Sequence, residues 1–491
     1  MQFRSRVTWL ALGCLSLACS VGANREPVHR PIERAPVAHG QRPVVTPPNL
    51  GGGAVAVPSP PVSPRSQRKL ADGELEWTPT DLGRLPLQGH REAELDRREA
   101  FVARLDGRIV WLDLSKREGL ALIGKVDGPV TFRLAHLHDA WVLKTIDRLS
   151  RRFPVGLSYF AESSFAPGPL AKLTALQMLE AGTYAAYPAP LRALRSMRGL
   201  RTLAWSGKVP AADAKILGEL TQLRVLDVRL TDLYRGPLVD VAKLTELQDL
   251  DIELVSDRQL RELTPLKQLR RLKISGHQLS DAGMGALTEF PELRELHAVF
   301  IGAKDPSFLA KLPQLEVLGL PKELDRSAVP YINGLRNLRE LDLFQAKFYG
   351  SDVLGLELPA LESLKFRNTP GAIAHFASYR TLQRLEIESS PLSPSEVEPL
   401  KRLPRLQHLS IKVEASAVRV LAECPALESL NLAGGATDQE LEALHHLQTL
   451  RRLELKWSRS TTLTACDQFP ELLHCVNRIA SFAEGGRPWL K

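Results

Sequence analysis

Residues 220–228 read Leu-Thr-Gln-Leu-Arg-Val-Leu-Asp-Val, and residues 244–252 read Leu-Thr-Glu-Leu-Gln-Asp-Leu-Asp-Ile. Both stretches place large apolar residues at their first, fourth, seventh and ninth positions. Copies of this phrase follow one another at a mean spacing of about 23 residues. Their fourth-position leucines are Leu176, Leu200, Leu223, Leu247, Leu269, Leu293, Leu315, Leu338, Leu361, Leu382, Leu406, Leu427, Leu450 and Leu472. A short phrase with this period predicts a stack of similar units that bury their apolar faces against one another.

Each unit combines a strand signal with a helix signal. The seventh and ninth residues of a copy are separated by one residue, so both side chains lie on one face of a strand. Downstream segments such as 280–287 and 437–444 repeat apolar residues every three or four positions, which predicts a short helix. Three helix starts carry a capping box, in which a hydroxyl and a Glu or Gln satisfy free backbone donors: Ser256 with Gln259, Ser393 with Glu396, and Thr437 with Glu440.

The phrase, its period, the Ser-Asp or Thr-Asp helix starts and a Pro-x-Leu before the strand, as in 403–406, resemble bacterial leucine-rich repeats. The resemblance implies an α/β solenoid, shaped as a horseshoe or arc, over residues 166–478. Parallel strands are expected on its concave face and short helices on its convex face. Such a scaffold has no single activity of its own.

The amino terminus has the layout of an export signal. Arg4 and Arg6 precede an apolar run from Val7 to Ala18 that is too short to span a bilayer. Residues 16–19, Ser-Leu-Ala-Cys, resemble a bacterial lipobox, which implies a signal peptide over 1–19 and lipidation of Cys19. Ser20 then resembles the residue that sorts lipoproteins to the outer membrane. The alternative is cleavage after Val21-Gly22-Ala23, which would release a soluble periplasmic or secreted protein.

Residues 20–71 are rich in Pro, Gly, Arg and Val, a composition that predicts a disordered tether. The tether and signal also account for the net charge of +8, because residues 1–70 contain nine Lys or Arg and two Glu. The rest of the chain is close to neutral. A basic chain would ordinarily suggest nucleic-acid binding, but this charge distribution argues against it.

Residues 72–165 are less regular than the repeats that follow them. Residues 105–114, 130–134 and 156–160 are expected to form three strands at repeat-like spacing. Terminal repeats diverge because they cap the exposed end of the core. We therefore expect an amino-terminal cap of divergent repeats continuous with the solenoid, and a carboxy-terminal tail over 479–491.

The sequence contains no motif for catalysis, and we expect a protein that is not an enzyme. It has no Gly-rich phosphate loop, no Gly-x-Ser-x-Gly elbow and no His-Glu-x-x-His. His136 and His138, or His445 and His446, do not make a metal site without further ligands, so neither a metal nor a cofactor is expected.

Three cysteines follow the signal. Cys424 takes the first apolar position of its repeat, which indicates a small buried thiol. Cys466 and Cys475 flank the last repeat, where a disulfide could staple the carboxy-terminal end in an oxidising compartment. Two buried thiols are the alternative, because a bridge depends on a Cα separation that sequence does not give.

The residues beside the strand leucines point into the concave face and form the candidate binding surface. Their charges alternate in bands, which could select a partner by complementary charge or could simply pair across neighbouring strands. The candidate partner-binding residues are Asp227, Asp249, Asp251, Glu253, Arg271, Lys273, Glu340, Asp342, Phe344, Lys365 and Arg367. Trp205 and Trp457 are further candidates, as aromatic anchors.

Together these features predict an exported, lipid-anchored scaffold of a bacterial cell envelope that binds a protein or peptide through its concave face. The alternative is a structural envelope protein that binds peptidoglycan or surface polysaccharide. A third hypothesis is a hydrolase with its site in residues 72–165.

Overall fold

The computed structural model describes most of residues 77–478. The described ranges are 77–80, 83–87, 95–97, 99–134, 140–161, 168–183, 191–206, 211–229, 238–456 and 472–478. Within 238–456, residues 255, 277–278, 300, 349, 369–370 and 435 are not described. The predicted signal peptide, Cys19, tether and tail lie outside the described residues.

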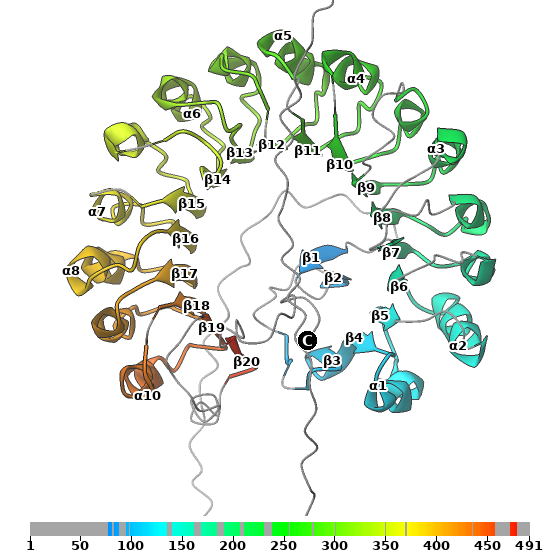
Figure 1. The fold of residues 1–491 in the computed structure, drawn as a ribbon, viewed down its shortest axis with the longest axis horizontal. Helices are drawn as coiled ribbons and strands as arrows, with labels where there is room; N and C mark the ends of the chain where they lie inside the picture. The colour runs from blue at the N-terminus through cyan, green and yellow to red at the C-terminus, as the bar shows by residue number, and fades with distance from the viewer. Residues whose placement is uncertain are drawn as a thin grey trace, which may run out of the picture. The chain divides into compact units, whose positions relative to one another are not determined.

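One long sheet follows the repeats, and its strands pair in chain order (Figure 1). β3 and β4 are antiparallel, and each later neighbour pair from β4 to β20 is parallel. The strands are β3 (Val102–Leu105), β4 (Arg108–Asp113), β5 (Val130–Leu134), β6 (Val155–Ala161), β7 (Met178–Thr183), β8 (Thr202–Ser206), β9 (Val225–Arg229), β10 (Asp249–Glu253), β11 (Arg271–Ser275), β12 (Glu295–Val299), β13 (Val317–Gly319), β14 (Glu340–Asp342), β15 (Ser363–Arg367), β16 (Arg384–Glu388), β17 (His408–Lys412), β18 (Ser429–Ala433), β19 (Arg452–Lys456) and β20 (His474–Arg478).

The sheet is open. β3 and β20 share no paired register among the described residues. One backbone hydrogen bond, from Arg97 N to Leu473 O at 2.9 Å, joins the segments beside these two end strands.

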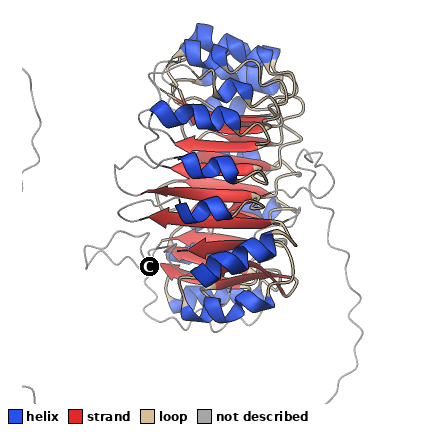
Figure 2. Cartoon of the chain, turned by 90° about the vertical axis from the view of Figure 1, so that its right-hand side faces the viewer, coloured by secondary structure: helices blue, strands red, loops and turns tan. Residues whose placement is uncertain are grey.

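Short helices lie on the outer side of the strands, and the strands stack side by side (Figures 1 and 2). The α-helices are α1 (Arg117–Leu122), α2 (Ala140–Ser150), α3 (Ala211–Glu219), α4 (Asp257–Glu262), α5 (Asp281–Met284), α6 (Val329–Asn333), α7 (Ala372–Phe376), α8 (Pro394–Val397), α9 (Val418–Leu421) and α10 (Asp438–Leu441). The 3-10 helices are η2 (Ile123–Lys125), η3 (Gly168–Lys172), η4 (Leu191–Ser196), η5 (Val241–Lys243), η6 (Gly285–Glu289), η7 (Pro306–Lys311), η8 (Arg326–Ala328), η9 (Gly350–Gly355), η10 (Glu398–Arg402), η11 (Ala415–Ala417) and η12 (Glu442–His446). Several repeats therefore carry a 3-10 helix where an α-helix was expected.

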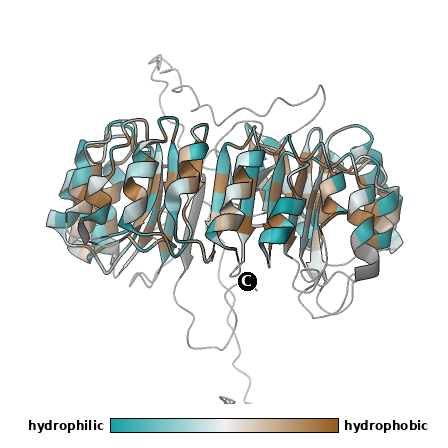
Figure 3. Ribbon diagram, turned by 90° about the horizontal axis from the view of Figure 1, so that it is seen from above, coloured by the Kyte–Doolittle hydropathy of each residue, from teal (hydrophilic) through white to brown (hydrophobic). Residues whose placement is uncertain are grey.

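The leucines of the repeat phrase form one continuous core between the strands and the outer helices. The seventh-position residues Leu226, Leu250, Leu272, Leu296 and Leu318 are all fully buried. Burying one such side chain contributes about 1.5–3 kcal/mol. Hydrophobic and hydrophilic residues accordingly follow one another along the strands, and both kinds occur on the outer helices (Figure 3). This arrangement confirms the predicted α/β leucine-rich repeat solenoid.

Polar groups repeat with the same period and join each unit to the next. The residue at the fifth position donates its N–H to the equivalent carbonyl of the preceding repeat, as Gln248 does to Arg224 O and Arg270 to Gln248 O, each at 2.8 Å. At the helix starts, the Asp257 carboxylate accepts from Ser280 N of the next repeat at 2.8 Å. The Asp281 carboxylate accepts from Lys304 N in the same way, at 2.6 Å. The Ser-Asp signature thus ties neighbouring convex helices together.

Among the described residues, one of the three predicted capping boxes is complete and the other two form in part. Ser256 Oγ accepts from Gln259 N at the start of α4. Ser393 and Glu396 make a complete capping box on α8. At α10, Thr437 N donates to Glu440 Oε2 at 2.9 Å.

The expected strands of the amino-terminal region lie in the sheet as β4, β5 and β6. The preceding segment is different. β1 (Thr78–Thr80) and β2 (Gly83–Leu85) pair with each other as an antiparallel hairpin on the inner side of the sheet, and within the described ranges neither pairs with another strand (Figure 1). We refer to residues 77–87 as the inner hairpin.

Candidate functional site

The concave face is built from two rows of residues, one on each side of the first strand leucine. The first row precedes that leucine and the second row follows it, and strand register aligns each row from strand to strand. From β10 to β18 the first row is Asp249, Arg271, Glu295, Val317, Glu340, Ser363, Arg384, His408 and Ser429. The second row is Asp251, Lys273, His297, Gly319, Asp342, Lys365, Glu386, Ser410 and Asn431.

The charges of these rows pair extensively with one another. Lys273 Nζ lies 2.6 Å from the Asp251 carboxylate, and Arg271 lies 3.3 Å from Asp249 and 3.6 Å from Glu295. Lys365 lies 2.9 Å from Glu386 and Arg384 lies 3.8 Å from Glu340. Arg367 pairs with Glu388 at 2.9 Å. Pairing across strands therefore accounts for most of the predicted charge bands. Half-exposed pairs of this kind each contribute about 0–1 kcal/mol.

The structure brings most predicted site residues together on this face. Eight of them, Asp227, Asp249, Asp251, Arg271, Lys273, Glu340, Asp342 and Lys365, lie in the two rows or their continuation onto β9. Glu253 and Arg367 are exposed at the ends of β10 and β15. Phe344 is half-buried just after β14, and its N–H donates to Asp342 Oδ1 at 2.9 Å.

One predicted aromatic anchor is wrong. Trp205 is only 2 % exposed and belongs to the main core, because it holds the ninth position of its repeat behind Leu203. Trp457 lies outside the described residues.

The inner hairpin covers the concave face over the early strands, which sequence analysis did not anticipate. Thr131 Oγ1 on β5 donates to Arg84 O at 2.6 Å, and the Arg84 guanidinium lies 3.4 Å from Asp227 on β9. Leu85 and Leu87 are fully buried in a second, smaller core with Trp111 of β4. Asp227, predicted to face a partner, is thus already engaged by the chain itself.

The amino-terminal end of the inner hairpin rests on a position that needs glycine. Trp77 packs with Met178 of β7 and is 3 % exposed. A Cβ at Gly156 of β6 would lie 2.8 Å from the Trp77 ring and 2.5 Å from Met178. Gly156 therefore makes room for both side chains.

The composition of the first row on the early strands could have indicated that the inner hairpin covers them. From β4 to β9 it reads Trp111, Thr131, Gly156, Met178, Thr202 and Val225, with no charged residue, whereas the later first row is largely charged. An uncharged stretch on a face otherwise rich in charge indicates a covered surface.

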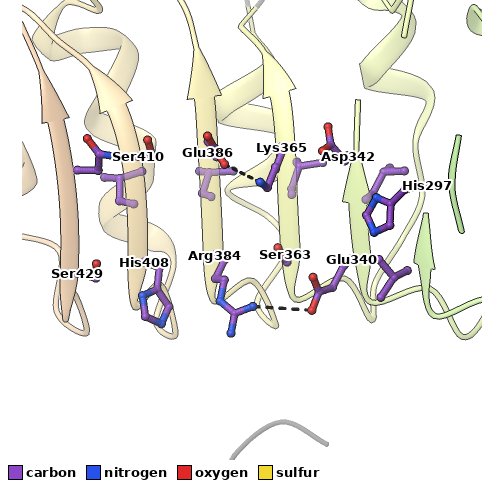
Figure 4. A pocket seen from close by; sticks show the side chains of 16 residues that line it. His297, Glu340, Asp342, Ser363, Lys365, Arg384, Glu386, His408, Ser410 and Ser429 are labelled. Carbon is purple, nitrogen blue, oxygen red and sulfur yellow. Dashed lines mark ion pairs between the residues drawn. The ribbon is translucent and has the colours of Figure 1, made fainter. Parts of the chain in front are cut away.

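Beyond the inner hairpin, the concave face is hollowed into a groove of about 380 Å³ that runs from β12 to β18. Figure 4 shows its polar lining, with the Lys365–Glu386 and Arg384–Glu340 ion pairs across it. At its β17–β18 end, His408, Ser410, Ser429 and Asn431 offer side-chain donors and acceptors.

Two groups in the groove have shifted pKa values. Burial, helped by the charges of Arg271, Lys273 and Lys365, lowers the pKa of His297 to about 4, so its imidazole is neutral at physiological pH. Burial also raises the pKa of Asp342, although the Phe344 N–H and Lys365 act in the opposite direction.

The cysteines and histidines singled out in the sequence do not form a metal or reactive site among the described residues. Cys424 is buried, and burial raises its pKa to about 12, as expected for an inert thiol. Cys466 lies outside the described residues, and of Cys475 only the backbone in β20 is described, so the proposed disulfide stays a prediction. His136 and His138 also lie outside, and His445 and His446 end η12. The described part of the chain contains no cluster of three potential metal ligands. It also has no helix of the length and apolar character that crossing a bilayer requires.

The comparison with protein families agrees with this fold. Residues 166–368 match the family model of the leucine-rich repeat region. No curated protein matches the chain. Similar solved structures include an internalin (inlF) from Listeria monocytogenes, 16 % identical over 68 % of this chain and 88 % of the internalin, with a TM-score of 0.31.

A leucine-rich repeat protein of Leptospira interrogans is 17 % identical, over 67 % of this chain and 91 % of its own, with a TM-score of 0.33. The plant peptide hormone receptor RGFR1, in complex with RGF2, is 16 % identical over 73 % of this chain and 64 % of the receptor, with a TM-score of 0.32. The repeat phrase, the parallel strand register and the family match together identify residues 166–368 as a leucine-rich repeat region within an α/β solenoid, a scaffold typical of protein–protein interaction.

Proposed function

We propose that this protein is an exported, lipid-anchored leucine-rich repeat scaffold that binds a protein or peptide partner through the groove from β12 to β18. The observation that carries the proposal is the groove itself, which is hollowed, half-exposed and lined by side chains of both charges. The rest of the concave face is less suitable, because the inner hairpin already covers β5 to β9.

The lining favours a polypeptide ligand. Because the charged side chains of the groove are already paired, a ligand can approach them at little cost in free energy, and their pattern can fix the position of a bound peptide. His408, Ser410 and Asn431 can form hydrogen bonds with backbone amides or polar side chains of the ligand. Arginine and carboxylate groups at the rim would set the association rate and its dependence on salt.

Site-specific photo-crosslinking in cells tests this proposal. A crosslinking residue at His408, in the groove, should give a discrete adduct that is absent with the same residue at Thr288, an exposed position on convex η6. The same adducts at both positions, or none at His408, would contradict groove binding. Co-sedimentation of the unmodified protein with purified cell wall would instead favour the structural alternative.

Export and anchoring need a separate test, since they depend on residues 1–23. Cys19→Ala should abolish fatty-acid labelling and move the protein from the membrane to the soluble fraction. Unchanged fatty-acid labelling of Cys19→Ala would rule out the lipobox. A wild-type protein that carries no fatty-acid label and is found in the soluble fraction would favour cleavage after Ala23.

A further inference from the structure

The inner hairpin shows how this concave face holds an arginine. Strand register places Glu180 of β7, Ala204 of β8 and Asp227 of β9 side by side in the second row. Arg84 pairs with Asp227 at 3.4 Å, and its charge also acts on the Glu180 carboxyl. The guanidinium is thus paired with one acid of the row and acts on a second, and the row residue between these two acids, Ala204, is small. The Arg84 side chain is only 8 % exposed.

A similar arrangement recurs on the open part of the same row. His297 of β12, Gly319 of β13 and Asp342 of β14 are register partners, again with a very small residue between two polar ones. We call these three residues the β13 notch. Gly319 is required there, because a Cβ would lie 2.6 Å from His297 Nδ1, so the imidazole leans over β13.

The carboxylate of the β13 notch is available for a cation. Asp342 Oδ1 accepts from Phe344 N, and no ion pair to Asp342 occurs among the described residues. The adjacent cation of the row, Lys365, lies 2.9 Å from Glu386 instead. Asp342 thus differs from the row carboxylates Asp227 and Asp251, each of which pairs with a basic side chain of this chain.

The groove lining contains three carboxylates, Glu340, Asp342 and Glu386, and two basic side chains, Lys365 and Arg384. Arg271 and Lys273 add positive charge at His297, so the attraction for a cation is centred on Asp342. His297 is neutral, so it does not repel a cation and can accept a hydrogen bond. A guanidinium suits this site better than an ammonium, because its planar fork can bond a carboxylate and a second acceptor while stacking on a ring.

We propose that the β13 notch is a specific subsite for an arginine side chain of the polypeptide partner, comparable to the part of the row where Arg84 pairs with Asp227. The proposal rests on the groove being the partner-binding surface and adds the chemistry of one partner residue. The partner is therefore expected to present an arginine that reaches Asp342.

The first experiment needs no partner. Full-length protein with 13C-labelled histidine is titrated with N-acetyl-argininamide, and the His297 imidazole signal is followed by NMR. We expect a saturable shift at millimolar ligand, a weaker response to N-acetyl-lysinamide and none to the uncharged N-acetyl-citrulline amide.

Variants locate the effect. Asp342→Asn should abolish the shift, and Gly319→Ala should weaken it by displacing the imidazole while keeping the carboxylate. Glu289→Gln, an exposed acid at the end of the outer helix η6, is the matched control and should leave the shift unchanged. Equal responses to argininamide and citrulline amide, or a wild-type response from folded Asp342→Asn protein, would overturn the proposal.

A partner captured by the crosslink at His408 provides the second measurement. Asp342→Asn should weaken its binding about tenfold, the loss expected for one charge-assisted hydrogen bond. Capture of a partner whose affinity is unaffected by Asp342→Asn would remove the subsite and leave the proposed function standing. An argininamide shift without any captured partner would support the subsite and count against the function.

Discussion

Replacing Arg84 by alanine should destabilise the early repeats far more than removal of an ordinary surface ion pair. Arg84 and Asp227 have side chains only 8 % and 20 % exposed, and Glu180 lies beside the same guanidinium. Removing one partner of a buried pair leaves an uncompensated charge and typically costs 3–5 kcal/mol. Because Asp227 keeps some access to water, we expect about 3 kcal/mol at pH 7.

The loss should depend on pH in a defined direction. Burial raises the pKa of Glu180 above its usual 4.5, so the folded protein holds a proton that the unfolded chain has released. Folded-state stability therefore falls as pH rises through the interval above 4.5. Without Arg84 the pKa of Glu180 rises further, so the deficit of the variant should grow as pH rises above 4.5.

Urea unfolding followed by tryptophan fluorescence and circular dichroism measures both effects. The control is Arg195→Ala, which removes a bidentate pair with Glu219 at 2.7 and 2.8 Å whose side chains are 47 % and 46 % exposed. This pair has better geometry but is far more exposed, so its removal should cost much less than Arg84→Ala. A loss below about 0.5 kcal/mol for Arg84→Ala at pH 7, or one independent of pH, would refute the role given to burial.

Three other outcomes are expected. The His297 imidazole should titrate near pH 4 when followed by NMR, and its midpoint should be higher in Lys273→Met. Because the pKa of His297 is lowered in the folded state, wild-type stability should decline as pH falls from 6.5. A titration midpoint near 6.5 would contradict the burial of His297. Cys424 should resist alkylation at pH 8 in the folded protein and react in urea, as mapped by mass spectrometry; rapid native labelling would disprove an inert thiol. Gly434→Ala should cost about 2 kcal/mol, since φ is +135° and a Cβ would lie 2.2 Å from a neighbouring carbonyl, whereas Gly285→Ala, with open space around it, should change stability little.

The repeat phrase predicts the fold well because its physical cause is local and periodic. A leucine at the fourth, seventh or ninth position is buried only if it points into the core between the strands and the helices. The spacing of these leucines therefore predicts the strand register, the face of each strand that is buried and the side of the sheet on which the helices lie. The same register also places Trp205 at a ninth position, which identifies it as a core residue rather than a groove anchor.

The sequence predicts which residues line the concave face, but it does not predict that the inner hairpin covers part of that face. The residues that flank the strand leucines do line it, yet the contact between Arg84 and Asp227 joins segments 143 residues apart and has no periodic signature. The groove depends on the same kind of detail. Gly319 looks like an ordinary strand residue until strand register places it between His297 and Asp342.

The inner hairpin also has a consequence for how the chain is made. It is synthesised before the strands on which it rests, and its last contact, Asp227, follows Arg84 by 143 residues. At about 5–20 residues per second, the ribosome needs roughly 7–30 s to produce that distance. Leu85 and Leu87 can pack once Trp111 has been made, but Trp77 waits for Met178 and Arg84 waits for Asp227. The first described segment to emerge thus completes its contacts only after β9 has been made, and chaperones or export factors that hold nascent chains have a defined window in which to bind it.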